Sequence, residues 1–146
     1  MQNLILSDCG VTTIIPYVHK CKFYHKKEIS TMGIVASNEI KAKNKANGKG
    51  EITIKHILGA GELNANDMYA QVTIPPGCSI GYHEHHGNAE SYYILEGEAL
   101  YDDNGQQMLT MTPGQTTYCP DGEGHSIENP SSDKNLVFMA LISKTV

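Results

Sequence analysis

Hydrophobic and polar residues alternate along short segments of the chain from residue 51 onward. In MYAQVTI, residues 68–74, every second residue from Met68 to Ile74 is apolar, and Tyr69 and Gln71 fall on the opposite face. Because strand side chains point alternately to the two faces of a sheet, this period of two predicts a half-buried β-strand. Alternation, or a β-branched and aromatic composition, predicts further strands at 51–58, 91–102, 106–111, 116–119, 125–129 and 136–142.

Turn signals separate these predicted strands. PPG (75–77), DDNG (102–105) and PG (113–114) are typical turn sequences, and Gly97 interrupts the longest predicted strand. No part of this region shows sustained helical periodicity. Many short strands joined by tight turns predict an all-β fold of the sandwich, jelly-roll or barrel type.

The first 50 residues carry different signals. VTTIIPYV (11–18) is β-branched and aromatic, which predicts a short strand or an extended arm, and Pro16 would confine such a strand to a sheet edge. The segment 38–51 is rich in Lys, Asn and Gly and predicts an exposed loop. We therefore expect an N-terminal extended arm and lysine-rich loop (1–50), packing on the barrel or on a partner, and the barrel itself (51–146).

Composition and charge narrow the classes of function. A chain of 146 residues, 40% of them hydrophobic, can form one domain with its own core. No apolar run is long enough to span a membrane, and the first residues lack the features of a secretory signal, so we expect a cytoplasmic protein without a membrane partner. The formal net charge is −5 and its acidic excess lies in residues 56–146, which argues against nucleic acid as a partner. The four cysteines are widely spaced, which favours reduced thiols.

Three histidines lie within four positions of one segment, YHEHH (82–86). If this segment is extended, His83 and His85 point to the same face and could hold one ion together. The Gly-Asn turn that follows could bring Glu90 back beside them, and His125, which follows another glycine-rich turn, is a candidate from a distant part of the chain. The sequence therefore predicts a metal site.

Strand alternation also divides the remaining histidines and acids. His86 follows His85 directly, so it should point away from the ion. Ordinary surface or core positions are expected for His19, His25 and His56, and solvated strand positions for Glu84, Glu96 and Glu98. Cys119 is expected to be a small buried apolar residue, and Asn129 to bond to the backbone of a turn.

Two spaced motifs contain the predicted ligands. The first has Gly77, five residues, His83, one residue, His85, four residues, Glu90, six residues and Gly97. The second has Gly114, five residues, Pro120, one residue, Gly122, two residues, His125, three residues and Asn129. Both resemble the two motifs of the cupin superfamily without a gap or a substitution. The chain from 51 to 142 is similar to the small single-domain cupins described as mannose-6-phosphate-isomerase-like.

This resemblance implies a double-stranded β-helix, which is a small jelly-roll barrel. It also implies that His83, His85, Glu90 and His125 are the ligands of one divalent transition metal per subunit. Three imidazoles and one carboxylate suit Fe, Mn, Ni, Co, Cu or Zn. Because ligand histidines must be deprotonated, the metal should be lost below a pH of about 6. The motif glycines are expected at turns with positive φ.

The motifs leave the reaction open. One hypothesis is a metal-dependent enzyme, of dioxygenase, isomerase or lyase type, acting on a small molecule; a non-catalytic small-molecule-binding or sensor protein is the alternative. Four polar residues, Tyr69, Gln71, Tyr92 and Tyr101, are candidates for the cavity wall. The chain has no arginine, which makes oxalate-type and sugar-phosphate ligands less expected, although lysine can also bind an anion. A single barrel leaves sheet edges, so a homodimer is expected.

Overall fold

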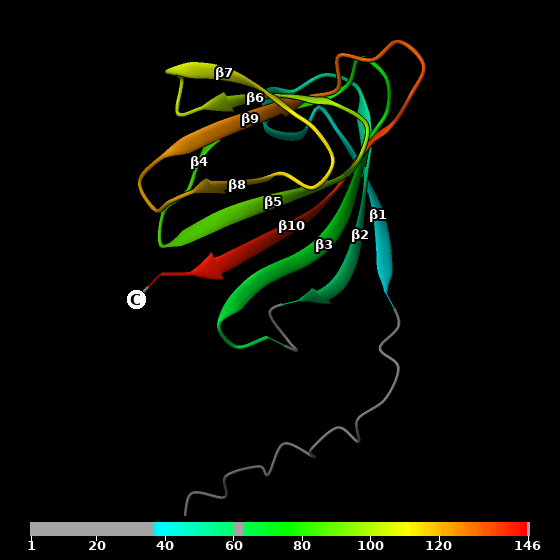
Figure 1. Ribbon diagram of the computed structural model, residues 1–146. Coiled ribbons are helices and arrows are strands. Elements are labelled where there is room, and N and C mark those ends of the chain that lie inside the picture. Colours follow the sequence, from blue (N-terminus) through cyan, green and yellow to red (C-terminus); the bar gives the residue numbers. More distant parts are fainter. Residues whose placement is uncertain (1–36, 60–62, 146) are drawn as a thin grey trace, which may run out of the picture. The chain divides into compact units, whose positions relative to one another are not determined.

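The computed structural model describes residues 37–59 and 63–145, and within them the chain forms two antiparallel β-sheets (Figure 1). The larger sheet contains, in spatial order, β1 (Asn38–Lys43), β2 (Glu51–Gly59), β3 (Asn66–Ile74), β10 (Leu136–Lys144), β5 (Asn88–Glu96) and β8 (Thr116–Cys119). The smaller sheet contains β4 (Ser79–Glu84), β9 (Gly124–Glu128), β6 (Ala99–Asp103) and β7 (Gln107–Met111). A short 3-10 helix, η1 (Lys45–Asn47), joins β1 to β2.

The core lies between the inner faces of the two sheets. In β3 the predicted alternation is confirmed, because Ala70, Val72 and Ile74 are buried and the residues between them are half-buried. The other strands add alternate residues to the same core, among them Ile52, Ile54, Ile80, Tyr92, Ile94, Tyr101, Ile127, Leu136 and Phe138. The chain therefore has the all-β, double-stranded β-helix fold that the sequence predicts.

The predicted turns have the expected backbone geometry. Gly77, Gly97, Gly114 and Gly122 all have positive φ, as predicted. Gly97 ends β5, and a Cβ atom there would lie 2.5 Å from the carbonyl oxygen of Asn135. A side chain is thus excluded by both conformation and space, and the predicted strand 91–102 divides at Gly97 into β5 and β6.

The expectation of an exposed loop or flexible connection over residues 38–51 is wrong for residues 38–43, whereas residues 44–50 do connect β1 to β2. Residues 38–43 form the edge strand β1, which pairs with β2 from Asn38↔His56 to Lys43↔Glu51. Its lysines lie on the exposed face, where they keep an edge strand soluble, and Lys41 Nζ lies 3.4 Å from a Glu51 carboxylate oxygen. The lysine-rich composition therefore belongs to the outer face of a strand.

Two further expectations concern the N-terminal arm and membrane spans. The arm predicted at 11–18 lies outside the described residues, so the division of the chain at residue 50 stays a prediction. In the described residues no helix is long and apolar enough to cross a membrane.

Asn129 is fully buried and its side-chain amide donates to the carbonyl oxygens of Ile74 and Lys134, both at 2.8 Å, which confirms its expected role.

Candidate metal centre

Four side chains from three strands converge at one end of the space between the sheets. His83 comes from β4, His85 follows the last residue of that strand, Glu90 comes from β5 and His125 from β9. One ligand atom of each residue lies within 4.8 Å of the others. The structure therefore brings together all four residues that the sequence selects as metal ligands.

An irregularity in β4 directs His83 toward this centre. Ile80 pairs with Ile127 and His83 pairs with His125, so the register between β4 and β9 shifts across Gly81. A β-bulge of this kind re-aims the side chains that follow it. Ile80 and His83 can therefore both face inward although they are three positions apart.

Loop contacts fix His85. Its backbone N–H donates to the carbonyl oxygen of Glu123 at 2.9 Å, and its carbonyl oxygen accepts from the Gly122 N–H at 2.8 Å. These bonds tie the loop after β4 to the turn before β9. The two segments that carry His85 and His125 thus hold each other in place.

Each histidine ring uses its Nδ1 atom outside the centre. His83 Nδ1 lies 3.0 Å from the Gly81 carbonyl oxygen, and His85 Nδ1 lies 2.8 Å from Asn88 Oδ1. His125 Nδ1 lies 2.9 Å from the hydroxyl oxygen of Tyr101. With Nδ1–H donating to these oxygens, all three rings direct the lone pair of Nε2 toward the centre, which is the tautomer that a metal requires.

The spacing of the ligand atoms fits a divalent ion. His125 Nε2 lies 3.1 Å from His85 Nε2, 3.2 Å from His83 Nε2 and 3.0 Å from Glu90 Oε2. Ligands about 2.1 Å from a shared ion would be separated by about 3.0 Å at octahedral angles and about 3.4 Å at tetrahedral angles. Three lone pairs facing one carboxylate cannot all be satisfied by hydrogen bonds within the group. The donor set therefore fits a divalent transition metal.

Burial and mutual contact set the protonation of the centre. Burial favours the neutral form of Glu90, but the contacts with three histidine rings outweigh it and lower the pKa of this carboxyl below its ordinary value. Burial lowers the pKa of His125, against the opposing influence of Glu90. The hydrogen bond with Glu90 raises the pKa of His85 above 6.5, although burial opposes it. The site therefore combines an ionised carboxylate with histidines that compete with each other for protons.

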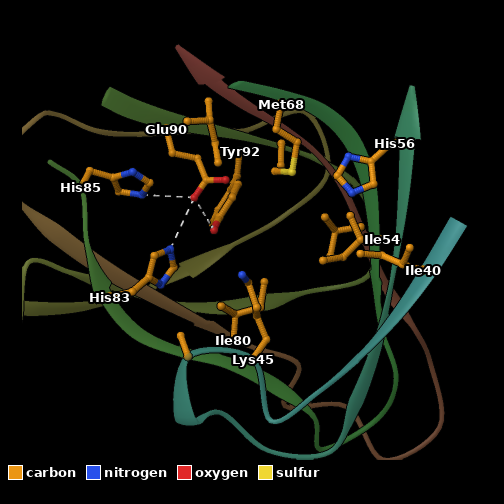
Figure 2. Close-up of a pocket in the computed structure, with 14 residues that line it drawn as sticks. Ile40, Lys45, Ile54, His56, Met68, Ile80, His83, His85, Glu90 and Tyr92 are labelled. Carbon is orange, nitrogen blue, oxygen red and sulfur yellow. Dashed lines mark hydrogen bonds and ion pairs between the residues drawn. The ribbon is translucent and has the colours of Figure 1, made fainter. Parts of the chain in front are cut away.

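A cavity of about 410 Å³ opens beside the centre (Figure 2). His85, Glu90 and His125 are buried, whereas the His83 side chain is 26% exposed. The centre is therefore most accessible on the His83 side. The wall is mostly apolar and includes Ile54, Met68, Val72 and Ile80. The volume is in the range of small-molecule sites.

The four polar candidates for the cavity wall lie in different places. Tyr92 lines the cavity, and its O–H donates to Glu90 Oε2 at 2.8 Å. Burial, reinforced by Glu90, raises the pKa of Tyr92 well above its ordinary value, so this donor stays protonated. Tyr101 lies behind His125, whereas Tyr69 and Gln71 alternate with the inward residues of β3. A catalytic part for any of the four stays a prediction.

The residues expected outside the centre include two confirmed cases. His86 is exposed, and its Nε2 atom lies 3.2 Å from Glu84 Oε2. Cys119 is 2% exposed, and burial raises the pKa of its thiol to about 11, as suits an unreactive buried side chain. His19 and His25 lie outside the described residues.

Two polar residues of the cavity wall were missed by the sequence analysis. His56 was expected to be an ordinary surface or core residue, but it lines the cavity across from His85 (Figure 2). Strand alternation could have placed His56 at the cavity, because it follows Ile52 and Ile54 at every second position on the inner face of β2. Lys45, in η1, also lines the cavity, and its sequence neighbours contain no comparable signal.

Comparison with known proteins agrees with the fold and the motifs. The chain is 38% identical to an oxalate-binding protein of Thermotoga maritima, over 75% of this chain and 92% of that protein. A crystal structure of a predicted oxalate decarboxylase from Thermotoga maritima covers 75% of this chain and 94% of its own, with 35% identity and a TM-score of 0.71.

A shorter match gives loose support to the mannose-6-phosphate-isomerase-like subgroup. A mannose-1-phosphate guanylyltransferase of Klebsiella pneumoniae is 40% identical over 60 residues, which are 41% of this chain and 12% of that enzyme. The family model of the cupin domain matches residues 70–142. That range contains both motifs and all four predicted ligands, and the chain therefore belongs to the cupin family.

Proposed function

We propose that the chain binds a small carboxylate, with oxalate as the first candidate, at a divalent transition metal. The observation that carries this proposal is the 38% identity to an oxalate-binding protein, which extends over 92% of that protein. The geometry supports it, because three of the four ligand side chains, those of His83, His85 and Glu90, border a mainly apolar cavity of suitable size.

The residues of the chain have distinct parts in this proposal. His83, His85, Glu90 and His125 would hold the ion, which when bound supplies a positive charge and open coordination positions for carboxylate oxygens. Glu90 cancels one charge of the ion, so the centre keeps an overall charge of +1 and attracts anions. The apolar wall excludes water and strengthens this attraction.

The absence of arginine does not count strongly against such a ligand. The expectation against oxalate-type ligands came from the missing guanidinium clamp. A metal ion can itself hold a carboxylate, and Lys45 provides a cation in the cavity wall. These two groups together replace what an arginine would supply.

A second candidate is an enzyme of dioxygenase, isomerase or lyase type that acts on the bound ligand. Two proton-carrying groups of the cavity wall favour it, namely the Tyr92 phenol and the His56 imidazole. The imidazole could donate a proton to a ligand at the centre or accept one from it, whereas the phenol, which stays protonated, could only donate. Binding alone would need neither.

The deciding experiment measures metal, binding and turnover on one preparation. Protein purified without chelator is analysed for bound metals, loaded with Mn(II), freed of excess ion and titrated with oxalate in a calorimeter. We expect one metal per subunit, and oxalate binding that disappears when a chelator removes the metal. Metal-loaded protein that fails to bind oxalate would contradict the proposal. Oxygen consumption or release of carbon dioxide from oxalate would favour the enzyme.

We also infer a homodimer in the cytoplasm. The support for the dimer is that β1 and β8 are the edge strands of the larger sheet as described, and unpaired edges favour contacts with a second chain. Size-exclusion chromatography with light scattering tests the dimer, and a single species of monomer mass would contradict it.

A further inference from the structure

Lys45, a charged residue of the cavity wall, has no counter-ion among the described residues. Four other lysines of the described chain pair with carboxylates, as Lys49 does with Glu128 at 3.5 Å and Lys144 with Asp67 at 3.6 Å, whereas Lys55 and Lys134 do not. Lys45 has no carboxylate oxygen within 4.0 Å among residues 37–59 and 63–145. Its ammonium nitrogen points into the cavity beside Ile80 (Figure 2).

With a divalent ion at the centre, the charges around the cavity do not balance without a ligand. Glu90 is the single carboxylate among the described residues that line it, and Lys45 adds a positive charge. A divalent ion at the centre raises the total to +2. The ion would lie beside a mostly apolar wall, where charges are less screened than in bulk water, so this excess favours a ligand with two negative charges over a ligand with one. Lys45 itself is exposed, so it tolerates the absence of a ligand by keeping its hydration.

The segment that carries Lys45 has an unusual backbone. Asn44, Ala46 and Asn47 have φ angles of 48°, 50° and 61°, which are left-handed values that non-glycine residues seldom adopt. Backbone strain of this kind persists only where surrounding contacts impose it, and such strain is concentrated at functional sites. The strain here surrounds the one residue of the segment whose charged group faces the cavity.

Those contacts come from β4, the strand that carries His83. Ser79 N donates to the Lys49 carbonyl oxygen and Lys49 N donates to Ser79 Oγ, both at 2.9 Å. Two glycines allow the backbones to meet, because a Cβ atom on Gly81 would lie 2.8 Å from Gly48 N and one on Gly48 would lie 2.6 Å from Gly81 N. Lys45 is thus placed relative to the metal ligands by direct backbone contact.

We propose that the ligand is a small dicarboxylate and that Lys45 binds the carboxylate oxygens that point away from the metal centre. This inference rests on the proposed function, since it assigns a residue to the ligand's second charge. Lys45 then distinguishes dianions from monoanions of the same size. It is a ligand-binding residue and needs no part in any bond-making step.

The test compares two ligands of similar size that differ by one charge. Oxalate and glycolate are titrated calorimetrically into the Mn(II)-loaded full chain of the wild type, Lys45→Met and Lys45→Gln. Lys49→Met is the matched control, because it removes a lysine charge from the same turn but one that pairs with Glu128 outside the cavity. Metal content and thermal unfolding are measured for every variant, both before and after titration.

We expect both Lys45 variants to lose oxalate affinity by at least about tenfold, as for a lost hydrogen bond to a charged group, and glycolate affinity by less than about threefold. Lys49→Met should keep both affinities, and all variants should keep the metal. Oxalate affinity in Lys45→Gln within twofold of the wild type, or equal losses for the two ligands, would overturn the role of Lys45. A wild-type protein that binds neither ligand would instead overturn the proposed function.

Discussion

The hydroxyl oxygen of Tyr101 lies 2.9 Å from Nδ1 of His125, on the side of the ring opposite the metal centre. Both residues are buried, with exposures of 2% and 0%. With the Tyr101 oxygen accepting the Nδ1 proton, Nε2 keeps a lone pair with which to bind an ion. The tyrosine therefore controls the tautomer of a ligand without being one.

Replacing this tyrosine should weaken metal binding. In Tyr101→Phe the Nδ1–H of His125 loses its acceptor in a buried place, and loss of such outer-shell partners typically costs about ten- to a hundredfold in metal affinity. Competition with a fluorescent chelator measures the affinity. Tyr118→Phe is the control, because that side chain is 63% exposed and lies away from the centre. Equal affinities for Tyr101→Phe and the wild type would contradict the assigned tautomer.

Substitution of His85 and of its neighbour His86 should have opposite effects on metal content. His85→Ala removes a buried nitrogen that lies 3.1 Å from His125 Nε2, so it should abolish stoichiometric metal binding. His86→Ala removes only an exposed ring beside Glu84, so metal content should stay nearly unchanged. Elemental analysis of the two variants decides the matter. Equal loss in both would refute the strand alternation from which the ligands were selected.

Acid should weaken metal binding at a higher pH than an unperturbed histidine predicts. Glu90 raises the pKa of His85 above 6.5, so in the metal-free protein a proton competes with the ion already above that pH. Affinity should therefore fall as pH falls, with the decline beginning above 6.5 and not at about 6. Competition with a chelator, measured at a series of pH values, follows the metal affinity. An affinity that stays constant down to about 6.5 would contradict the shift.

Strand alternation selected His83 and His85 over His86, because the two faces of an extended segment are set by local geometry. The turn sequences and the spaced motifs added Glu90 and His125, the latter 40 residues beyond His85. The same alternation places His56 inward with Ile54. No histidine or acid lies two positions from His56, so local spacing does not mark it as a site residue.

The segment that carries Lys45 could not be predicted in this way. Composition favoured a loop at 38–51 because the segment is rich in Lys, Asn and Gly, yet residues 38–43 form a strand by pairing with β2. The left-handed residues that follow are held by contacts with β4, which is about 30 residues away in sequence. Contacts of that range leave no local pattern, so the sequence alone gave no sign that Lys45 borders the cavity.

Displacing this segment should affect ligand binding without removing any functional group. Gly48 has a φ of −73°, which alanine can adopt, but its Cβ would lie 2.6 Å from Gly81 N and closer still to the Ser79 carbonyl oxygen. Because both neighbours are backbone, Gly48→Ala must push the turn and Lys45 away from β4. We expect a loss of about 1–3 kcal/mol in unfolding free energy and a lower oxalate affinity at unchanged metal content.

The control for this displacement is a glycine at which alanine is strained but meets no neighbour. Gly105 has a φ of 68° and open space around its missing side chain, and it lies in the turn between β6 and β7. Gly105→Ala should lower the unfolding free energy by about 1 kcal/mol and leave oxalate affinity intact, because backbone strain there does not reach the cavity. If Gly48→Ala bound oxalate as tightly as Gly105→Ala, the position of Lys45 would not matter for the ligand, and the contact between the turn and β4 would serve stability alone.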